Sequence, residues 1–195
     1  MKLKVNSIFA LVAIIALSAF TNGAKPVTYT VDAAKSSITW VAKKVTGSHN
    51  GTVALKSGSL NVDGKNVTGG SFVIDMTTIK DAGGSAKLEG HLNSEDFFST
   101  AKFPTSTFVI TKITGKGASV TVAGNLTIKG ITQPLSFPAT VAVNADGTVS
   151  ALAGKITVDR TKYDIRYGSK SFFESIGDKA IDDNFELAVK LVAAK

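Results

Sequence analysis

The stretch Leu88–Phe108, LEGHLNSEDFFSTAKFPTSTF, interrupts a chain whose pattern is otherwise that of short strands. Asn93 or Ser94 is a suitable N-cap, because either side chain accepts a hydrogen bond from a free N–H in the first turn of a helix. The two acidic residues that follow would lie in that first turn, where carboxylates oppose the positive end of the helix dipole. Pro104 ends the segment, so the sequence predicts a short helical insert between two strands.

The insert is rich in aromatic residues and holds four of the chain's 11 phenylalanines: Phe97, Phe98, Phe103 and Phe108. Such a segment either plugs the end of a barrel as ordinary core or gates an apolar cavity. Adjacent residues on a helix point about 100° apart, so Phe97 and Phe98 cannot face one cavity equally. We expect one to pack into a barrel mouth and the other against the outer strands or a partner.

Outside the insert, the dominant hydrophobic period is two. Val27, Tyr29 and Val31 alternate with polar residues, and the same alternation runs from Phe185 to Leu191. This pattern is typical of strands with one buried face. It predicts strands over residues 27–32, 36–46, 51–62, 66–77, 105–115, 118–129, 132–143, 148–160 and 182–193, the first continuing the second across a kink.

Glycine-containing turn signals separate these strands: Asn50-Gly51, Asp63-Gly64, Lys116-Gly117, Lys129-Gly130 and Asp146-Gly147. Long antiparallel strands leave unpaired edges unless the sheet closes on itself. About eight strands close a barrel that is filled by side chains or holds one small ligand. A β-sandwich fits the same pattern, so the pattern alone leaves both folds open.

Residues 71–76 and 108–110 are apolar on both faces. Their outward side chains therefore need cover from the insert or from a partner, and a homodimer would provide it.

The first 24 residues have the composition of a signal peptide. Lys2 and Lys4 precede an apolar run of 13 residues, Ile8–Phe20, which is short for a membrane span and suits a signal-peptide core. Gly23 or Ala24 fits the last position before cleavage. We expect a periplasmic or secreted protein that comprises residues 25–195, and a retained anchor is the alternative.

Composition excludes several classes of protein. The absence of cysteine excludes a disulfide scaffold, thiolate catalysis and cysteine-ligated metal, and 195 residues with 44% hydrophobic content suit one domain. The formal net charge is +7, and loss of the two N-terminal lysines lowers it to +5. The lysines are scattered and not interleaved with aromatic residues, which does not indicate nucleic-acid binding.

The chain carries no catalytic or metal-binding motif. H-E-x-x-H, G-x-S-x-G, the P-loop and G-x-G-x-x-G are all absent. His49 is expected in a solvated loop beside the Asn50-Gly51 turn. His91 is either a structural residue or a contact at the mouth of a cavity. Asp159 and Asp182-Asp183 are interpreted as turn and solvent residues at strand ends.

Both arginines of the chain, Arg160 and Arg166, lie within seven residues of each other. Arg160 follows the period of Ile156 and Val158, so its side chain is expected to point inward at a strand end. A buried guanidinium needs partners. These are backbone carbonyls, a carboxylate or the anionic head of a ligand. The structural alternative is a salt bridge to an acid such as Asp159, Asp164 or Glu174, and the functional one is contact with a ligand head.

Four segments of the chain, in order, resemble motifs of the YceI-like family, whose members are small periplasmic or secreted lipid-binding proteins with a lipocalin-like barrel. They are Val31-Asp32 with Ser36-Ser37-Ile38; L-x-x-H-L-x-S-x-D-F-F-x-x-x-x-F-P-x-x-x-F in the insert; residues 124–130 with Thr132, Pro134 and Leu135; and Val158-Asp159-Arg160 with Tyr163. The resemblance favours the barrel over the sandwich. It implies an all-β, antiparallel up-and-down lipocalin-like barrel of about eight strands with a short helical insert.

The resemblance also implies a lipid partner, such as a polyisoprenoid, a quinone or a similar amphiphile, with transient contact to membrane surfaces and no cofactor, metal or nucleic acid. Each buried methylene contributes ~0.8 kcal/mol, so a dozen would give roughly 10 kcal/mol before ordering costs. The residues expected to contact the ligand are Ile38, Trp40, Phe72, Ile74, Leu88, His91, Leu92, Phe97, Phe98, Phe108, Leu126, Ile128, Phe137, Ile156, Val158, Arg160 and Tyr163.

The sequence thus predicts an exported carrier that sequesters or transports a lipid and is not an enzyme. Two alternatives stay open at this point. One is an isomerase or hydrolase of amphiphiles that uses the barrel as its pocket. The other is a surface interaction protein whose barrel is filled solid.

Overall fold

The computed structural model describes residues 25–195, which form nine β-strands, one α-helix and two short 3-10 helices. The predicted signal peptide lies outside the described residues. The elements are β1 (Val27–Val31), β2 (Ser37–Lys44), β3 (Gly47–Asp63), β4 (Asn66–Asp81), α1 (Ala86–Asn93), β5 (Thr105–Lys116), β6 (Ser119–Ile128), β7 (Ile131–Val143), β8 (Val149–Asp159), η1 (Arg160–Tyr163), η2 (Gly177–Lys179) and β9 (Ile181–Ala194).

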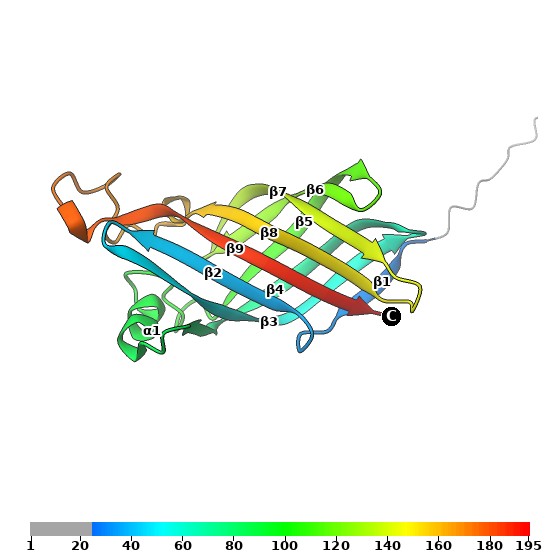
Figure 1. Cartoon of the computed structure of the whole chain (residues 1–195), viewed down its shortest axis with the longest axis horizontal. Coiled ribbons are helices and arrows are strands. Elements are labelled where there is room, and N and C mark those ends of the chain that lie inside the picture. The colour runs from blue at the N-terminus through cyan, green and yellow to red at the C-terminus, as the bar shows by residue number, and fades with distance from the viewer. Residues whose placement is uncertain (1–24) are drawn as a thin grey trace, which may run out of the picture.

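The strands close into an antiparallel up-and-down barrel (Figure 1). From β2 to β9, strands that are consecutive in the chain pair with each other, and β9 pairs back with β2. β1 and β2 both lie between β3 and β9, so the described strands fill eight positions around the barrel. The predicted all-β, lipocalin-like barrel with one short helix is therefore confirmed.

A kink between β1 and β2 lets two strands share one position in the barrel. The Asp32 carboxylate accepts hydrogen bonds from the N–H groups of Ala34 and Lys35, at 3.0 and 3.2 Å. The Ser36 hydroxyl donates to the Asp32 carbonyl at 2.7 Å and accepts from the Val192 N–H of β9 at 3.1 Å. The predicted continuation of the first strand across a kink is confirmed.

Four of the five predicted glycine turns close hairpins, but the prediction of a turn at Asn50-Gly51 is wrong. Val45 and Thr46 form the turn between β2 and β3, and Gly51 lies inside β3. A Cβ atom at Gly51 would lie 1.8 Å from the Lys80 carbonyl oxygen, so glycine serves a close approach of β4 at this position. His49 consequently lies on a strand and not in a loop, with its Nδ1 3.6 Å from the Asp81 carboxylate.

The helix lies earlier in the chain than predicted. Ser85 is its N-cap, and the Ser85 hydroxyl accepts a hydrogen bond from the Leu88 N–H at 3.3 Å. Ser94 is the C-cap, and its hydroxyl donates to the His91 carbonyl at 2.8 Å. The predicted capping roles of Asn93 and Ser94 are wrong because these residues end the helix, and residues 95–98 form a turn.

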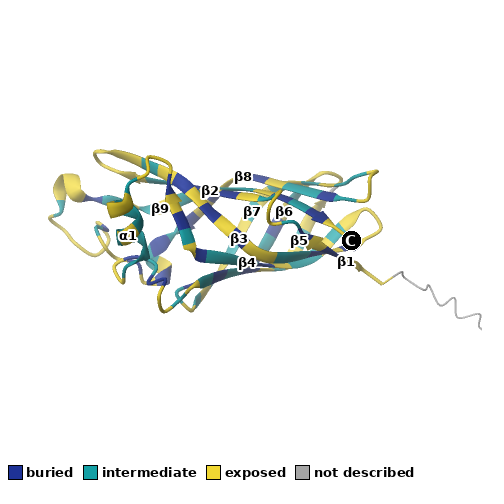
Figure 2. Ribbon diagram, turned by 90° about the horizontal axis from the view of Figure 1, so that it is seen from below, coloured by how far each residue is buried: buried dark blue, intermediate teal, exposed yellow. Residues whose placement is uncertain are grey.

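One end of the barrel is packed and the other carries the insert. Tyr29, Val31, Val62, Val149 and Ala193 are buried together where β1, β3, β8 and β9 meet. Buried and exposed residues alternate over residues 51–56 of β3 (Figure 2), as a strand with one inward face requires. The end that carries α1 lies opposite the C-terminus in Figure 1 and is called the mouth end below.

The doubly apolar strands are only partly covered. Val73 of β4 is half-buried, whereas Val109 of β5 points outward and is exposed. A partner that covers Val109 stays a prediction.

Candidate functional site

The barrel encloses a cavity of about 220 Å³. Every strand from β2 to β9 contributes to its lining, as do the insert and the segment after β8. Apart from Ser106, Arg160 and Asp182, all the lining residues are apolar. An apolar protein cavity of about 150 Å³ stays dry and admits apolar guests, so a space of this size suits hydrocarbon.

Thirteen of the residues predicted to contact a ligand line this cavity: Ile38, Trp40, Phe72, Ile74, Leu92, Phe97, Phe98, Phe108, Leu126, Ile128, Phe137, Ile156 and Arg160. Their binding role stays a prediction. Among the described residues, four of the predicted contacts lie outside the lining: Leu88, His91, Val158 and Tyr163. Val158 and Tyr163 are packed in the surrounding core, Leu88 packs against that core, and the His91 ring is engaged by other aromatic rings.

Phe97 and Phe98 both line the cavity, which corrects the expectation that they would face different ways. The 100° separation of helical neighbours does not apply to them because they lie in a turn. The Phe97 N–H donates to the Ser94 carbonyl, and the Phe98 N–H donates to the Leu92 carbonyl, at 3.2 and 3.1 Å. Phe98 meets Phe185 of β9 edge-on, with 6.5 Å between ring centroids.

An aromatic cluster of three rings stands at the mouth end. His91 packs edge-on against Phe97 and against Tyr167, with centroids 4.9 and 4.6 Å apart, and Phe97 lies 5.5 Å from Tyr167. The His91 Nε2 atom lies 3.0 Å from an Asp96 carboxylate oxygen. The cluster joins the insert to the segment after β8, which is consistent with the structural role for His91. A ligand contact by His91 stays a prediction.

Aromatic rings also line the cavity itself. Phe72 stacks with Phe108 at 6.5 Å, and Phe108 lies 5.5 Å from Phe137, which gives a row across β4, β5 and β7. Trp40 of β2 is buried, and its indole N–H donates to the Thr52 carbonyl at 3.3 Å. Because it is the chain's only tryptophan, its fluorescence reports on the cavity.

The guanidinium of Arg160 is committed to the main chain. Its Nη1 donates to the carbonyls of Ile165 and Tyr167 at 2.9 and 2.8 Å. Its Nε and Nη2 donate to the carbonyls of Asp182 and Ile181, each at 3.0 Å. Backbone carbonyls were one of the predicted kinds of partner, beside a carboxylate and a ligand head, and carbonyls from two segments accept all four of these bonds.

Arg160 also pairs with a carboxylate, since its Nη2 lies 3.6 Å from Asp183. Burial lowers the pKa of Arg160, and the neighbouring acid Asp183 opposes that effect. Burial raises the pKa of Asp183, but hydrogen bonds from Ser169 and Ser171 and the Arg160 charge outweigh it, so the pKa falls below its usual value. The pair therefore stays ionised inside the fold.

Asp159, which precedes the lining residue Arg160, has structural partners. The Asp159 carboxylate accepts from the Thr161 N–H at 3.0 Å and from its hydroxyl at 2.6 Å, which caps η1. Burial raises the pKa of Tyr163 to about 12, so the phenol is neutral at physiological pH. Within residues 25–195, no cluster of three His, Asp or Glu side chains could hold a metal ion. The helices in the same range are too short or too polar to cross a membrane.

Several cavity-lining residues on β3, β4 and β9 were not predicted, among them Val53, Leu55, Met76, Ile79, Phe185, Leu187, Val189 and Leu191. The signal was present, because the alternation from Phe185 to Leu191 already marks one face of β9 as inward.

The sequence matches the family model for the YceI-like domain over residues 29–193, which is most of the chain. The chain belongs to the YceI-like family. A UPF0312 protein of Shewanella sp. (strain ANA-3) is 36% identical over 84 residues, 43% of this chain and 44% of that protein. A UPF0312 protein of Pseudomonas aeruginosa (strain LESB58) is 33% identical over 89 residues. The chain thus aligns with less than half the length of these relatives.

Two solved structures resemble this YceI-like protein over most of its length. Burkholderia cenocepacia BcnA has a TM-score of 0.69 at 25% identity, covering 84% of this chain and 99% of BcnA. A polyisoprenoid binding domain from Saccharophagus degradans, implicated in plant cell wall breakdown, has a TM-score of 0.65 at 15% identity, covering 85% and 97%. The second likeness shows the fold alone.

Proposed function

We propose that this YceI-like protein binds a long apolar or amphiphilic lipid, such as a polyisoprenoid or a quinone, inside its barrel and sequesters or carries it. The observation that carries the proposal is an apolar cavity of about 220 Å³ whose lining contains only three polar residues among those described. The related domain from Saccharophagus degradans, a polyisoprenoid binding domain, supports the class of ligand.

The two alternatives receive less support. A solid-core interaction protein would have a filled barrel, whereas this one has internal space. Hydrolysis by nucleophilic catalysis needs a nucleophile paired with a base, and the described lining residues include one serine and no histidine. Binding by exclusion of hydrocarbon from water needs neither group.

The cavity proposal is tested with a variant that fills the space. Ala153 of β8 is buried and lines the cavity, so Ala153→Leu places a larger side chain inside it. Ala54 of β3 is exposed and points outward, so Ala54→Leu is the matched control. Binding of farnesol is followed by Trp40 fluorescence, and co-purifying lipid by native mass spectrometry. We expect Ala153→Leu to weaken binding and Ala54→Leu to leave it unchanged. Equal affinities in both variants would contradict the proposal.

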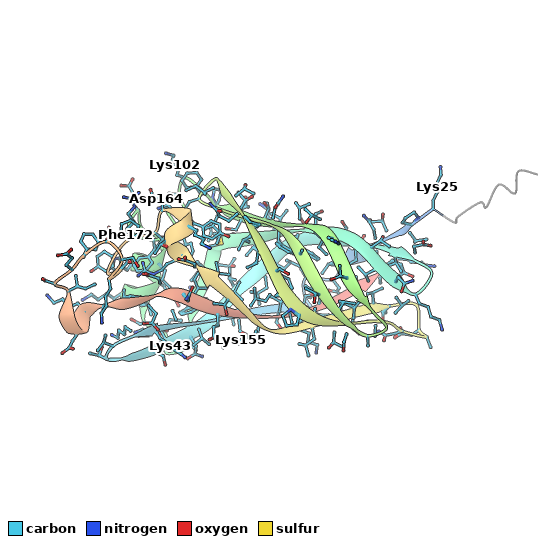
Figure 3. All side chains as sticks on the ribbon, turned by 90° about the horizontal axis from the view of Figure 1, so that it is seen from above. Lys25, Lys43, Lys102, Lys155, Asp164 and Phe172 are labelled. Carbon is cyan, nitrogen blue, oxygen red and sulfur yellow. The ribbon has the colours of Figure 1, made fainter. Side chains whose placement is uncertain are left out.

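The proposed carrier role includes transient contact with a membrane at the mouth end, after export to the periplasm or the medium. Tyr167, Phe172 and Phe173 are 45%, 44% and 48% exposed, all within the loop after η1. Arg166 lies over the Phe172 ring at 4.8 Å, and Lys170 is exposed beside them. Figure 3 shows Phe172 at the same end of the molecule as Lys102 and Asp164. Exposed aromatic rings flanked by cations suit an anionic lipid surface.

Vesicle flotation tests this contact. Phe172→Ser should reduce binding to vesicles that contain an anionic lipid, whereas Val109→Ser, at an exposed position on the outer face of β5, should not. Equal flotation of both variants and of the unaltered protein would argue against the loop as the contact.

A further inference from the structure

Ser106 is an unpartnered hydroxyl in an apolar cavity. It is the second residue of β5, it is 4% exposed, and it lines the cavity. Its Oγ atom is buried and has no hydrogen-bond partner among residues 25–195. A buried hydroxyl without a partner destabilises a fold, so such a group in a native protein calls for an explanation.

The strand pattern makes a serine unexpected at this position. Phe108 and Ile110 follow at the next inward positions of β5, and Ile74 pairs with Ser106 from β4. An apolar residue would match these neighbours without the loss of hydration that the hydroxyl incurs. The serine therefore weakens the empty barrel and gives it a polar atom that faces the ligand space.

Ser106 lies at the mouth end of the cavity. β5 begins directly after Pro104, and the Pro104 carbonyl accepts a hydrogen bond from the Met76 N–H at 3.0 Å. The other polar lining residues, Arg160 and Asp182, follow the end of β8 and open β9, also at the end opposite the packed residues. A hydrocarbon chain that extends from the mouth end toward the packed end would therefore contact only apolar side chains of the described lining.

We infer that the Ser106 hydroxyl donates a hydrogen bond to the oxygen of a neutral polar head, an alcohol or a carbonyl, on an amphiphile whose chain extends toward the packed end. This inference rests on the proposed function and names the ligand's head group. The Ser106 hydroxyl donates its proton to the oxygen of the head, and its Oγ atom can accept a hydrogen bond from the O–H of an alcohol.

The head is neutral because, within residues 25–195, the lining offers it no free cation. Arg160 is the cationic residue of the lining, and its guanidinium donates four hydrogen bonds to main-chain carbonyls and pairs with Asp183. A phosphate or carboxylate drawn into this space would lose hydration and gain no counter-charge. An uncharged oxygen loses far less hydration free energy on entering the cavity, and a hydrogen bond from Ser106 compensates for part of that loss.

The test uses three probes that share one isoprenoid chain: farnesol with an alcohol head, farnesene with no head, and farnesyl diphosphate with an anionic head. Each is titrated against the purified protein with Trp40 fluorescence as the readout. Ser106→Ala removes the hydroxyl, and Ser106→Thr retains it. Ser136→Ala on β7 is the matched control, because Ser136 is exposed and points outward. Thermal melts show whether each variant is folded.

We expect Ser106→Ala to weaken farnesol binding about three- to tenfold, the range of one neutral hydrogen bond, and to leave farnesene binding unchanged. Ser106→Thr should restore farnesol affinity, and Ser136→Ala should change nothing. The diphosphate should bind the unaltered protein more weakly than the alcohol does. Equal losses for farnesol and farnesene, or tighter binding of the diphosphate, would overturn the head-group inference alone. Failure of the unaltered protein to bind any of the three would overturn the proposed function as well.

Discussion

Replacement of Arg160 by methionine tests whether this arginine holds the fold or the ligand. The side chain is 4% exposed, and its four hydrogen bonds reach the segment after η1 and the start of β9. Methionine retains an apolar stem of similar length but has no donor. Arg160→Met therefore leaves four carbonyl oxygens without this donor and the Asp183 carboxylate without its nearby positive charge.

The loss of stability follows from these contacts. Removing one member of a buried ion pair costs about 3–5 kcal/mol, and each buried acceptor left unpaired costs about 1–3 kcal/mol. Water reaches some of the carbonyls because the loop after η1 is exposed, so the separate costs do not add in full. We expect Arg160→Met to lower the free energy of unfolding by about 3–5 kcal/mol, a large share of the 5–15 kcal/mol typical of a domain.

Urea unfolding followed by Trp40 fluorescence measures this loss, and Arg166→Met is the control. Arg166 pairs with Asp164 at 2.7 Å, but the two side chains are 59% and 55% exposed, so its removal should cost less than about 1 kcal/mol. Farnesol affinity per folded molecule should be unchanged in both variants. A fall in affinity of tenfold or more with little loss of stability in Arg160→Met would refute the reasoning and make Arg160 a ligand group.

Three further predictions concern the gate, the response to pH and a close approach of strands. Phe98→Ala removes a half-buried ring from the cavity wall, so stopped-flow fluorescence should show faster farnesol release than from the unaltered protein. Its loss of stability should be smaller than that of Phe97→Ala, because Phe97 is buried. Equal losses of stability with unchanged release rates in both variants would contradict a gate. The folded-state pKa of Tyr163, about 12, exceeds the unfolded value of about 10, so its contribution to stability is complete below pH 10 and is lost as pH rises toward 12. Urea titrations should show that Tyr163→Phe loses less stability over this range, and identical losses would contradict the assignment. Gly51→Ala should lower the free energy of unfolding by about 1–3 kcal/mol in the same assay, because the new Cβ would overlap the Lys80 carbonyl oxygen. An unchanged free energy of unfolding would contradict the close approach of the two strands.

The strands were predictable because their signals are local. The alternation from Phe185 to Leu191 specifies an inward face whatever its neighbours are, and Lys129-Gly130 adopts the positive φ angles of a two-residue hairpin, 51° and 75°. Closure of the barrel was not visible in that pattern, since a sandwich has the same alternation. The family resemblance selected the barrel, and the pairing of β9 with β2 confirms it.

The helix was misplaced because the sequence offers two sites with equal capping chemistry. Ser85 and Ser94 each have a hydroxyl suited to an N-cap, and contacts distant in sequence select the first. The Asp81 carboxylate accepts from the Ser85 N–H at 3.1 Å, and Lys80 pairs with Glu89 at 2.8 Å, which fixes the first turn against β4. Such contacts depend on the fold and leave no local pattern.

The kind of partner that Arg160 needs was predictable, because a buried guanidinium requires carbonyls, a carboxylate or a ligand head. The identity of those partners was not. Two of the four carbonyl acceptors belong to Ile181 and Asp182, more than 20 residues away at the start of β9. Burial at the strand end was inferred correctly from the period of Ile156 and Val158, because inward direction is a local property and the choice of partner is not.

The distribution of polar groups determines what the cavity can select. At the mouth end, Arg160, Asp183 and His91 are each engaged by neighbouring groups of the fold, so they hold the segment after β8 and the insert together and offer a ligand little. Affinity must then come mainly from burial of hydrocarbon, at ~0.8 kcal/mol per methylene, and should rise with chain length until the cavity is full. A single hydroxyl, that of Ser106, adds at most one neutral hydrogen bond, about tenfold in affinity. The protein should therefore discriminate strongly by chain length and against charged heads, and weakly among neutral head groups, which suits a carrier that accepts a class of lipids.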